Sequence, residues 1–214
     1  MADKKPVWKD PRGIARAAVV GLFVDLACYA LSVLGWVFTL DAMSGVIPEP
    51  LSDGGLTLNE LSSVLVLLSY VVVGVIVLMW IYRVCVNAHT LTHGMESSAW
   101  GAVLWYFVPI AYLWKPFSSL AEIWRVSESP EKWRVIDPPP LMRWWWGLWL
   151  ARAFTGYAAF QVQRLAAGST NGDPGAILSI ISEVAMIGAI LAMIAIIRRL
   201  TANQILAHEQ NVFD

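Results

Sequence analysis

Residues 99–127 read AWGAVLWYFVPIAYLWKPFSSLAEIWRVS, and this stretch decides how the chain meets a membrane. It is apolar enough to enter a bilayer, but Pro109 interrupts it and Lys115-Pro116 ends its apolar half. A spanning helix needs roughly 20 apolar residues, and too few uncharged residues precede Lys115 for a comfortable span. We therefore predict that residues 99–127 form a Pro-broken segment that re-enters a membrane or lies along its surface.

Four other blocks are long enough to span a bilayer. The chain is 57% hydrophobic and 14% charged, whereas a soluble domain carries about 25% charged residues. Its apolar residues stand in long runs, and the expected spans cover residues 17–40, 61–86, 144–163 and 176–198. Because lipid leaves backbone polar groups to be satisfied internally, these runs predict helices. The fold class expected is an all-α integral membrane protein with four transmembrane helices and the broken segment.

The expected organisation is a single helical membrane domain over residues 17–200. A basic N-terminal segment, residues 1–16, precedes it, and a tail, residues 201–214, follows it. The first apolar run exceeds the usual signal-peptide core of about 7–15 residues, so we interpret it as a retained helix.

Lysine and arginine are unevenly distributed between the connections. They gather before the first span, after the second, between residues 115 and 143, and after the last, whereas residues 41–60 have none and four acidic residues. Positive residues mark the cytoplasmic side of a membrane. Four spans put every basic cluster in the cytoplasm together with both termini, while a fifth full span at residues 99–127 would translocate one cluster.

A short amphipathic pattern follows the Lys-Pro pair. Phe117, Leu120, Ala121 and Trp124 recur at helical spacing, with polar residues on the other faces. Such a pattern is typical of a helix at a membrane surface.

The same region resembles a bacterial membrane family, the domain of unknown function 4328 family. Its hallmark is an aromatic pair, then Phe-Val/Ile-Pro-Ile, Leu-Trp-Lys-Pro, Glu-x-Trp and a serine, and the resemblance covers roughly residues 80–133. The motif positions taken as candidate site residues are Trp105, Pro109, Trp114, Lys115, Pro116, Glu122 and Trp124. Where the family usually has Asn before Leu-Trp-Lys-Pro, this chain has Tyr112. The resemblance implies a multi-span protein of the bacterial cytoplasmic membrane and carries no established activity.

Three charged residues interrupt three of the expected spans: Asp25, Arg152 and Glu183. Charges inside a bilayer cost free energy and usually pair or line a polar path. Asp25 and Arg152 match best in depth, so we expect them to form an ion pair. The functional alternative is a proton or ion path through all three.

Cys85, His89 and His93 follow one another at helical spacing, which puts them on one rough face. These residue types suit zinc or copper. Cys85 and His93 would lie about 12 Å apart along the axis, so they could not share one ion. We predict no metal site, with His89 and His93 as weak candidates, and interpret the group as an interfacial polar patch.

Twelve tryptophans are unusual for 214 residues. Trp144, Trp145, Trp146 and Trp149 open the third span beside Arg143. Indole prefers the headgroup boundary, so one interpretation is an aromatic belt. The other is a contact surface for lipid or a partner protein that includes Arg125 and Arg143, and a bound quinone or pigment stays open.

The chain has no Gly-rich phosphate loop, nucleophile elbow or zinc-protease helix, and its net charge of −1 disfavours nucleic acid. The leading hypothesis is a non-enzymatic inner-membrane protein, an accessory or scaffolding subunit whose partners are membrane lipids and other membrane-protein subunits. One alternative is a small transporter that uses the three intramembrane charges. Another is a haem-, pigment- or metal-binding redox subunit. No cofactor is predicted.

Overall fold

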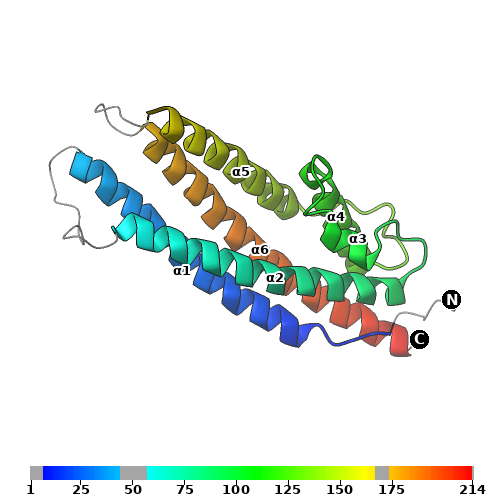
Figure 1. The fold of residues 1–214 in the computed structure, drawn as a ribbon. Coiled ribbons are helices and arrows are strands. Elements are labelled where there is room, and N and C mark those ends of the chain that lie inside the picture. The colour runs from blue at the N-terminus through cyan, green and yellow to red at the C-terminus, as the bar shows by residue number, and fades with distance from the viewer. Residues whose placement is uncertain (1–6, 44–56, 167–173, 214) are drawn as a thin grey trace. The chain divides into compact units, whose positions relative to one another are not determined.

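The computed structural model describes residues 7–43, 57–166 and 174–213, and every regular element within these ranges is a helix (Figure 1). In chain order the elements are α1 (Arg12–Met43), α2 (Leu58–Leu91), α3 (Ala99–Leu104), the 3-10 turn η1 (Ala111–Leu113), α4 (Lys115–Glu128), α5 (Pro140–Ala166) and α6 (Pro174–Phe213).

Three of these helices, α1, α2 and α6, are long and apolar enough to cross a membrane. Their 32, 34 and 40 residues rise about 1.5 Å each, so every one exceeds a hydrocarbon core of roughly 30 Å. The expected all-helical fold is confirmed for the described residues, with three helices that could span a membrane. The remaining expected span, residues 144–163, lies within α5, which has 27 residues but is less apolar, because its tryptophans carry a polar N–H and Arg152 a charge.

The outward face of α2 is almost entirely apolar. Exposed apolar side chains recur along it at helical spacing, among them Val64, Leu67, Leu68, Val71, Val72, Val75 and Met79. Soluble monomers rarely expose a continuous apolar patch of this kind. A lipid environment removes the cost of leaving it uncovered, so this face supports the membrane interpretation.

The helices extend further than the apolar blocks predicted. Helix α6 continues to Phe213, so the described part of the segment expected as a tail, residues 201–213, is helical. Arg198 and Arg199 are exposed, whereas Leu200, Thr201 and Gln204 are buried on the opposite side of the helix. The arginines therefore mark where the apolar face ends and not where the helix ends. At the other end of the chain, α1 begins at Arg12, before the start expected at residue 17, and the Arg12 N–H bonds to Asp10 Oδ1 at 2.9 Å.

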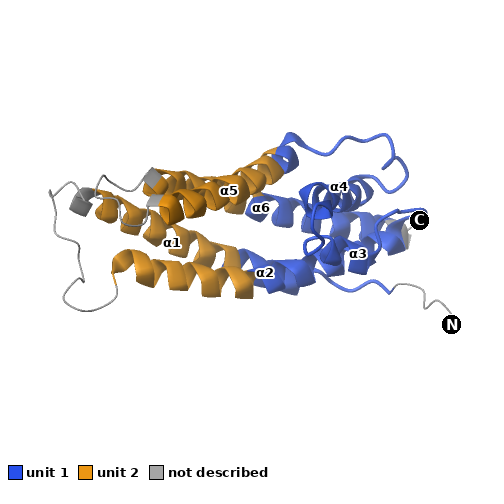
Figure 2. Cartoon of the chain, turned by 45° about the horizontal axis from the view of Figure 1, so that its top comes forward, with its two compact units in different colours: residues 1–20, 74–143, 193–214 blue, residues 21–73, 144–192 orange. Residues whose placement is uncertain are grey.

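The described residues fall into two compact units, coloured in Figure 2. Unit 1 comprises residues 7–20, 74–143 and 193–213, and unit 2 comprises residues 21–43, 57–73, 144–166 and 174–192. Helices α1, α2, α5 and α6 each contribute to both units. Unit 1 holds all of α3, η1 and α4.

Polar side chains join the helix ends within unit 1. Asn87 exchanges two hydrogen bonds with the backbone of Lys9, at 3.1 and 2.8 Å, and also donates to Gln204 at 3.4 Å. Gln204 in turn donates to the Val84 carbonyl at 2.7 Å. Asn87 and Gln204 are fully buried, so these bonds are protected from water. They attach the segment before α1 and the last turns of α6 to the end of α2.

Residues 99–127 do not form one continuous helix, and the break expected at Pro109 is present. Helix α3 is six residues long and is capped by Ser98, whose hydroxyl accepts the Gly101 N–H. The chain then turns through Pro109, and α4 starts at Lys115 with Pro116 in its first turn. Proline suits the first turn because it lacks the N–H that would be left without a partner there.

Candidate functional site

Glu122 of α4 holds the connection between α2 and α3. Its side chain is only 5% exposed, and its two carboxylate oxygens accept the backbone N–H groups of Glu96 and Ser97 at 2.7 and 2.9 Å. Hydrogen bonds to an ionised acceptor are roughly twice as strong as neutral ones. The Glu-x-Trp pair of the sequence motif is therefore a structural clamp, with Trp124 donating to Glu128 at 2.7 Å.

The same loop is also held from the side of α2. The Ser97 carbonyl accepts a hydrogen bond from His89 Nε2 at 2.9 Å, and Cys85 Sγ lies 3.7 Å from the same oxygen. His93 is exposed and lies beside a different cavity. The described residues contain no group of three or more His, Cys, Asp or Glu side chains that could hold a metal ion.

A cavity of about 360 Å³ lies beside the clamp. Three cationic side chains line it, from Lys115, Arg125 and Arg134. Two tryptophan rings lie beside these cations. Lys115 Nζ lies 5.5 Å from the ring centre of Trp105. The guanidinium carbons of Arg125 and Arg134 lie 6.0 and 5.1 Å from the ring centre of Trp133. Cation–π contacts at these distances position a charge without neutralising it.

The charge of this cavity is positive. Glu96 and Glu122 also line it, but the Glu122 oxygens both accept backbone N–H groups. Among the described residues the ion pair within 4 Å is that of Arg12 and Asp10. The three cations therefore face the cavity without a carboxylate in direct contact.

Gly94 lets Arg134 approach the cavity wall. Its φ of +81° belongs to the left-handed region that glycine adopts without strain. A Cβ atom at this position would lie 2.9 Å from Arg134 Nη2. Any other residue here would have to displace the guanidinium.

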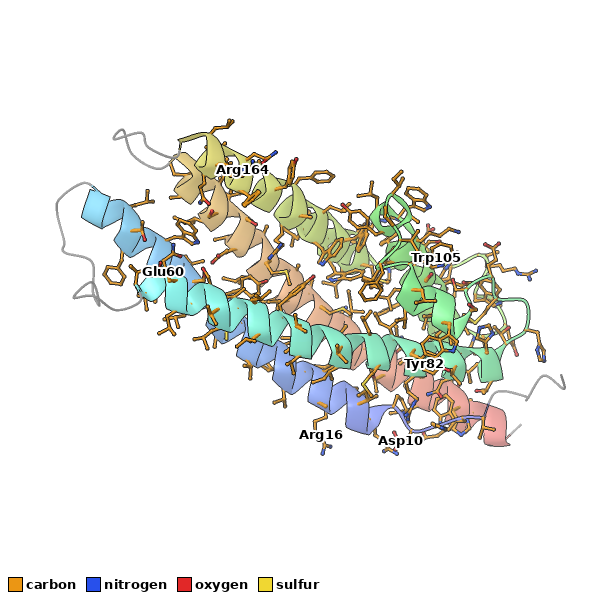
Figure 3. All side chains as sticks on the ribbon, in the orientation of Figure 1. Asp10, Arg16, Glu60, Tyr82, Trp105 and Arg164 are labelled. Atoms are coloured by element: carbon orange, nitrogen blue, oxygen red, sulfur yellow. The ribbon has the colours of Figure 1, made fainter. Side chains whose placement is uncertain are left out.

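An exposed apolar tip connects α3 to α4. We define the apolar tip as residues 104–114; its most exposed large side chains belong to Leu104, Phe107, Ile110 and Trp114. In Figure 3 the labelled Trp105 marks this part of the chain. The tip lies directly beside the cavity in sequence, because Trp105 and Lys115 belong to the cavity wall.

The backbone of the tip is strained at Ile110. Its φ and ψ are 67° and −54°, and the Ala111 N–H bonds to the Pro109 carbonyl at 2.8 Å across it. This is the rarer, strained form of the γ-turn, and a β-branched residue there is an outlier. The side chain of Ile110 is nevertheless 69% exposed. Strain of this kind persists only where the surroundings hold it, and it gathers at functional sites.

A second polar cluster lies in unit 2, around Arg152. Arg152 Nη2 lies 3.4 Å from the Tyr29 hydroxyl, and its guanidinium carbon lies 5.8 Å from the ring centre of Tyr70. The expected direct ion pair with Asp25 is not formed. Arg152 is instead bonded to Tyr29, on the same helix as Asp25.

Glu183 has partners of its own in unit 2. Its Oε1 accepts hydrogen bonds from Ser32 at 2.7 Å and Trp36 at 3.3 Å. No ion pair joins Glu183 to Arg152 within the described residues. Three buried polar atoms of this cluster have no hydrogen-bond partner: Asp25 Oδ1, Arg152 Nε and Glu183 Oε2.

Comparison with known proteins identifies the family. The family model described as Domain of unknown function (DUF4328) matches residues 50–202, which is more than half of the chain. The chain belongs to the DUF4328 family. No curated protein and no solved structure matches it.

The DUF4328 motif residues have different structural roles. Glu122 and buried Trp124 hold the loop and α4, and Pro116 lies in the first turn of α4. Trp105 and Lys115 line the cavity. Pro109 and Trp114 belong to the apolar tip and are exposed. The motif thus combines a clamp, a cavity wall and a tip in one segment.

The aromatic surface expected in this DUF4328 protein is smaller than the sequence indicated. Trp144 is 69% exposed, but Trp145 and Trp146 are buried, and Trp146 stacks on Trp149 at 4.8 Å. Arg143 is exposed.

The amphipathic helix expected at residues 117–124 does not lie on the surface of the protein. Its apolar stripe is buried within the protein, at Leu120, Ala121 and Trp124.

Several residues of these sites lay outside the sequence predictions. Trp133 completes the cavity from a turn with no regular periodicity, next to Arg134 of the expected cytoplasmic basic cluster. Tyr29, Ser32 and Trp36 carry the polar contacts of unit 2. Together with Asp25, they recur along α1 at helical spacing. That polar stripe was the signal in the sequence that could have found them.

Proposed function

We propose that this protein is a non-enzymatic, multi-span protein of the bacterial cytoplasmic membrane that serves as an accessory or scaffolding subunit. The observation that carries the proposal is the apolar tip. Its exposed side chains, among them Phe107 and Trp114, are presented by a loop and a helix that the Glu122 clamp holds in place. Aromatic side chains on a preorganised support are typical of binding hot spots.

In this proposal α5 also spans the membrane, together with α1, α2 and α6. Residues 99–127 begin and end on one side of the membrane. Thr92, which follows α2, and Pro130, which follows α4, line one cavity of about 660 Å³. Their proximity within unit 1 supports a re-entrant or interfacial segment. The contacts of Lys9 with Asn87 and of Asn87 with Gln204 support placing both chain ends on that side. The positive-inside rule makes it the cytoplasmic side.

The proposed partner is a spanning helix of another membrane protein, which the tip would contact at the edge of the bilayer. Gentle detergent extraction should then recover the chain in a complex much larger than its own 23.7 kDa. The double variant Phe107→Ala/Trp114→Ala should elute as the single chain in its micelle. The matched control is Leu67→Ala/Val71→Ala, which removes two exposed apolar side chains from α2 and should leave the complex intact.

Two results would contradict this proposal. One is a wild-type protein that elutes as the single chain after gentle extraction. The other is a tip variant that keeps the full complex while remaining folded, as judged by its helical circular dichroism.

A small transporter is the second candidate, and the unsatisfied atoms of unit 2 favour it. Asp25 Oδ1, Arg152 Nε and Glu183 Oε2 are buried and have no hydrogen-bond partner. Buried polar atoms are usually satisfied by protein or water, so a path for water or ions would explain them. Solute flux into liposomes that Asp25→Asn abolishes would favour this function over scaffolding.

A further inference from the structure

We propose that the cavity lined by Lys115, Arg125 and Arg134 binds a phosphate group, as carried by an anionic membrane lipid or by free phosphate. This inference goes beyond the proposed scaffolding role and does not depend on it. It rests on the charge, the donors and the position of the cavity.

The donors of the cavity match phosphate chemistry. Arg125 and Arg134 both lie beside Trp133, at 6.0 and 5.1 Å, so the indole supports two guanidinium groups at one wall. Guanidinium presents several N–H donors in a planar fork that matches the oxygens of a phosphate. Arg125 uses its Nε for the Ala121 carbonyl at 3.3 Å, which fixes the side chain. Its terminal nitrogens stay available to a ligand.

The remaining wall supplies a third cation and hydroxyl groups. Lys115 lies over Trp105 at 5.5 Å, and Ser118 and Ser119 line the same cavity. The volume of about 360 Å³ falls in the range of ligand sites, about 300–1,000 Å³. No carboxylate of the described residues pairs with any of the three cations. An incoming anion would therefore not have to displace an existing ion pair.

The position of the cavity explains how a lipid would reach it. Lys115 directly follows the exposed Trp114, and Trp105 directly follows the exposed Leu104. A phosphate between the three cations would therefore be adjacent to the apolar tip, along which acyl chains could lie. Basic pockets beside membrane helices bind anionic headgroups by the same combination of charges.

The experiment uses full-length protein in nanodiscs that contain phosphatidylcholine with or without phosphatidylglycerol. Native mass spectrometry then counts the lipids that stay bound to the protein after its release from the nanodisc. We expect wild type to retain phosphatidylglycerol in preference to phosphatidylcholine. The double variant Arg125→Gln/Arg134→Gln should retain at least tenfold less. The matched control Arg16→Gln removes an exposed positive charge of unit 1 outside the cavity and should retain as much as wild type.

A second arm separates the lipid from free phosphate. Wild-type protein in a neutral detergent is heated in inorganic phosphate or in chloride at equal ionic strength. A rise in Tm with phosphate that the double variant lacks, without retention of phosphatidylglycerol, assigns the site to free phosphate. Retention of phosphatidylglycerol assigns it to the lipid.

The inference is overturned if neither anion binds wild type better than its neutral or chloride control. It is also overturned if the double variant, with an unchanged circular dichroism spectrum, binds as well as wild type. A milder variant, Gly94→Ala, displaces Arg134 while keeping every cation. It should weaken retention without abolishing it. The size of the complex after gentle extraction tests the scaffolding role, whereas lipid retention and Tm test the phosphate site. Either proposal can therefore be disproved while the other stands.

Discussion

Glu122 and Ser97 lie 25 residues apart in the chain, yet the buried Glu122 carboxylate accepts the Ser97 N–H at 2.9 Å. The second oxygen of the carboxylate accepts the N–H of Glu96. One ionised side chain therefore satisfies two consecutive backbone donors that no helix supplies with partners.

Glu122→Gln should lower the stability of the protein. An amide has only one acceptor oxygen, so its NH2 group would face one of the two backbone donors. We expect a loss of about 1–3 kcal/mol, the usual cost of stranding a buried polar group, measured as a lower Tm in detergent and faster proteolysis between α2 and α3. Glu131→Gln, at an exposed position, is the control. Equal Tm values for the two variants would disprove the clamp.

Replacing Ile110 by glycine should stabilise the tip. Glycine adopts positive φ freely, whereas Ile110 is the described non-glycine residue that has it, at 67°. We expect a gain of about 1 kcal/mol from the released strain. Val108→Gly, two residues earlier at an ordinary φ, should instead destabilise through chain entropy. Thermal unfolding of the two glycine variants checks this prediction. Changes in Tm of the same sign for both variants would contradict it.

Asn87→Ala should release the segment before α1. The amide of Asn87 supplies both hydrogen bonds to the Lys9 backbone, and alanine supplies neither. Hydrogen exchange at residues 7–10 should rise at least tenfold, while Asn203→Ala, a half-buried position in α6, leaves it unchanged. Unaltered exchange in Asn87→Ala would mean that other contacts hold the segment.

Tyr29→Phe should uncouple Arg152 from α1. The hydroxyl of Tyr29 is the hydrogen-bond partner of Arg152 Nη2, and its loss should cost about 1–3 kcal/mol. In double-mutant cycles, Tyr29 with Arg152 should show a larger coupling energy than Asp25 with Arg152, because a hydrogen bond joins Arg152 to Tyr29 and no ion pair joins it to Asp25. The reverse order would restore the direct Asp25–Arg152 pair expected from the sequence.

Single cysteines at Thr92 and Ser129 should be protected together. In a background lacking Cys28 and Cys85, both positions should resist a membrane-impermeant reagent added outside the cell. A cysteine at Ser52, which lies outside the described residues, should react. Labelling of Ser129 but not Thr92 would show that residues 99–127 span the membrane.

The sequence predicted the helices and the break better than it predicted their surroundings. Long apolar runs and a proline within residues 99–127 are local features, so they identified the spanning candidates and the interruption. The stripe of Leu120 and Trp124 was misassigned to a membrane surface, because an amphipathic face fits a bilayer or a neighbouring helix equally well. Only the packed structure distinguishes the two.

The cavity was harder to foresee for a related reason. Lys115 and Arg125 lie ten residues apart in one segment, but Arg134 reaches them from a later turn. Their meeting depends on the path of residues 129–135 and on the space left by Gly94. Neither leaves a periodic signal in the chain. The Tyr29 contact with Arg152 similarly depends on which faces of α1 and α5 meet.

The backbone of Ser97 is hydrogen-bonded on both sides of its Cα atom, the N–H to Glu122 and the carbonyl to His89. Two hydrogen bonds through one residue therefore link the last turns of α2 to the body of α4. If bilayer thickness or a neighbouring helix rotates that end of α2, then either α4 moves with it or one of the two Ser97 hydrogen bonds breaks. The tip that α4 supports would then swing with the membrane around it.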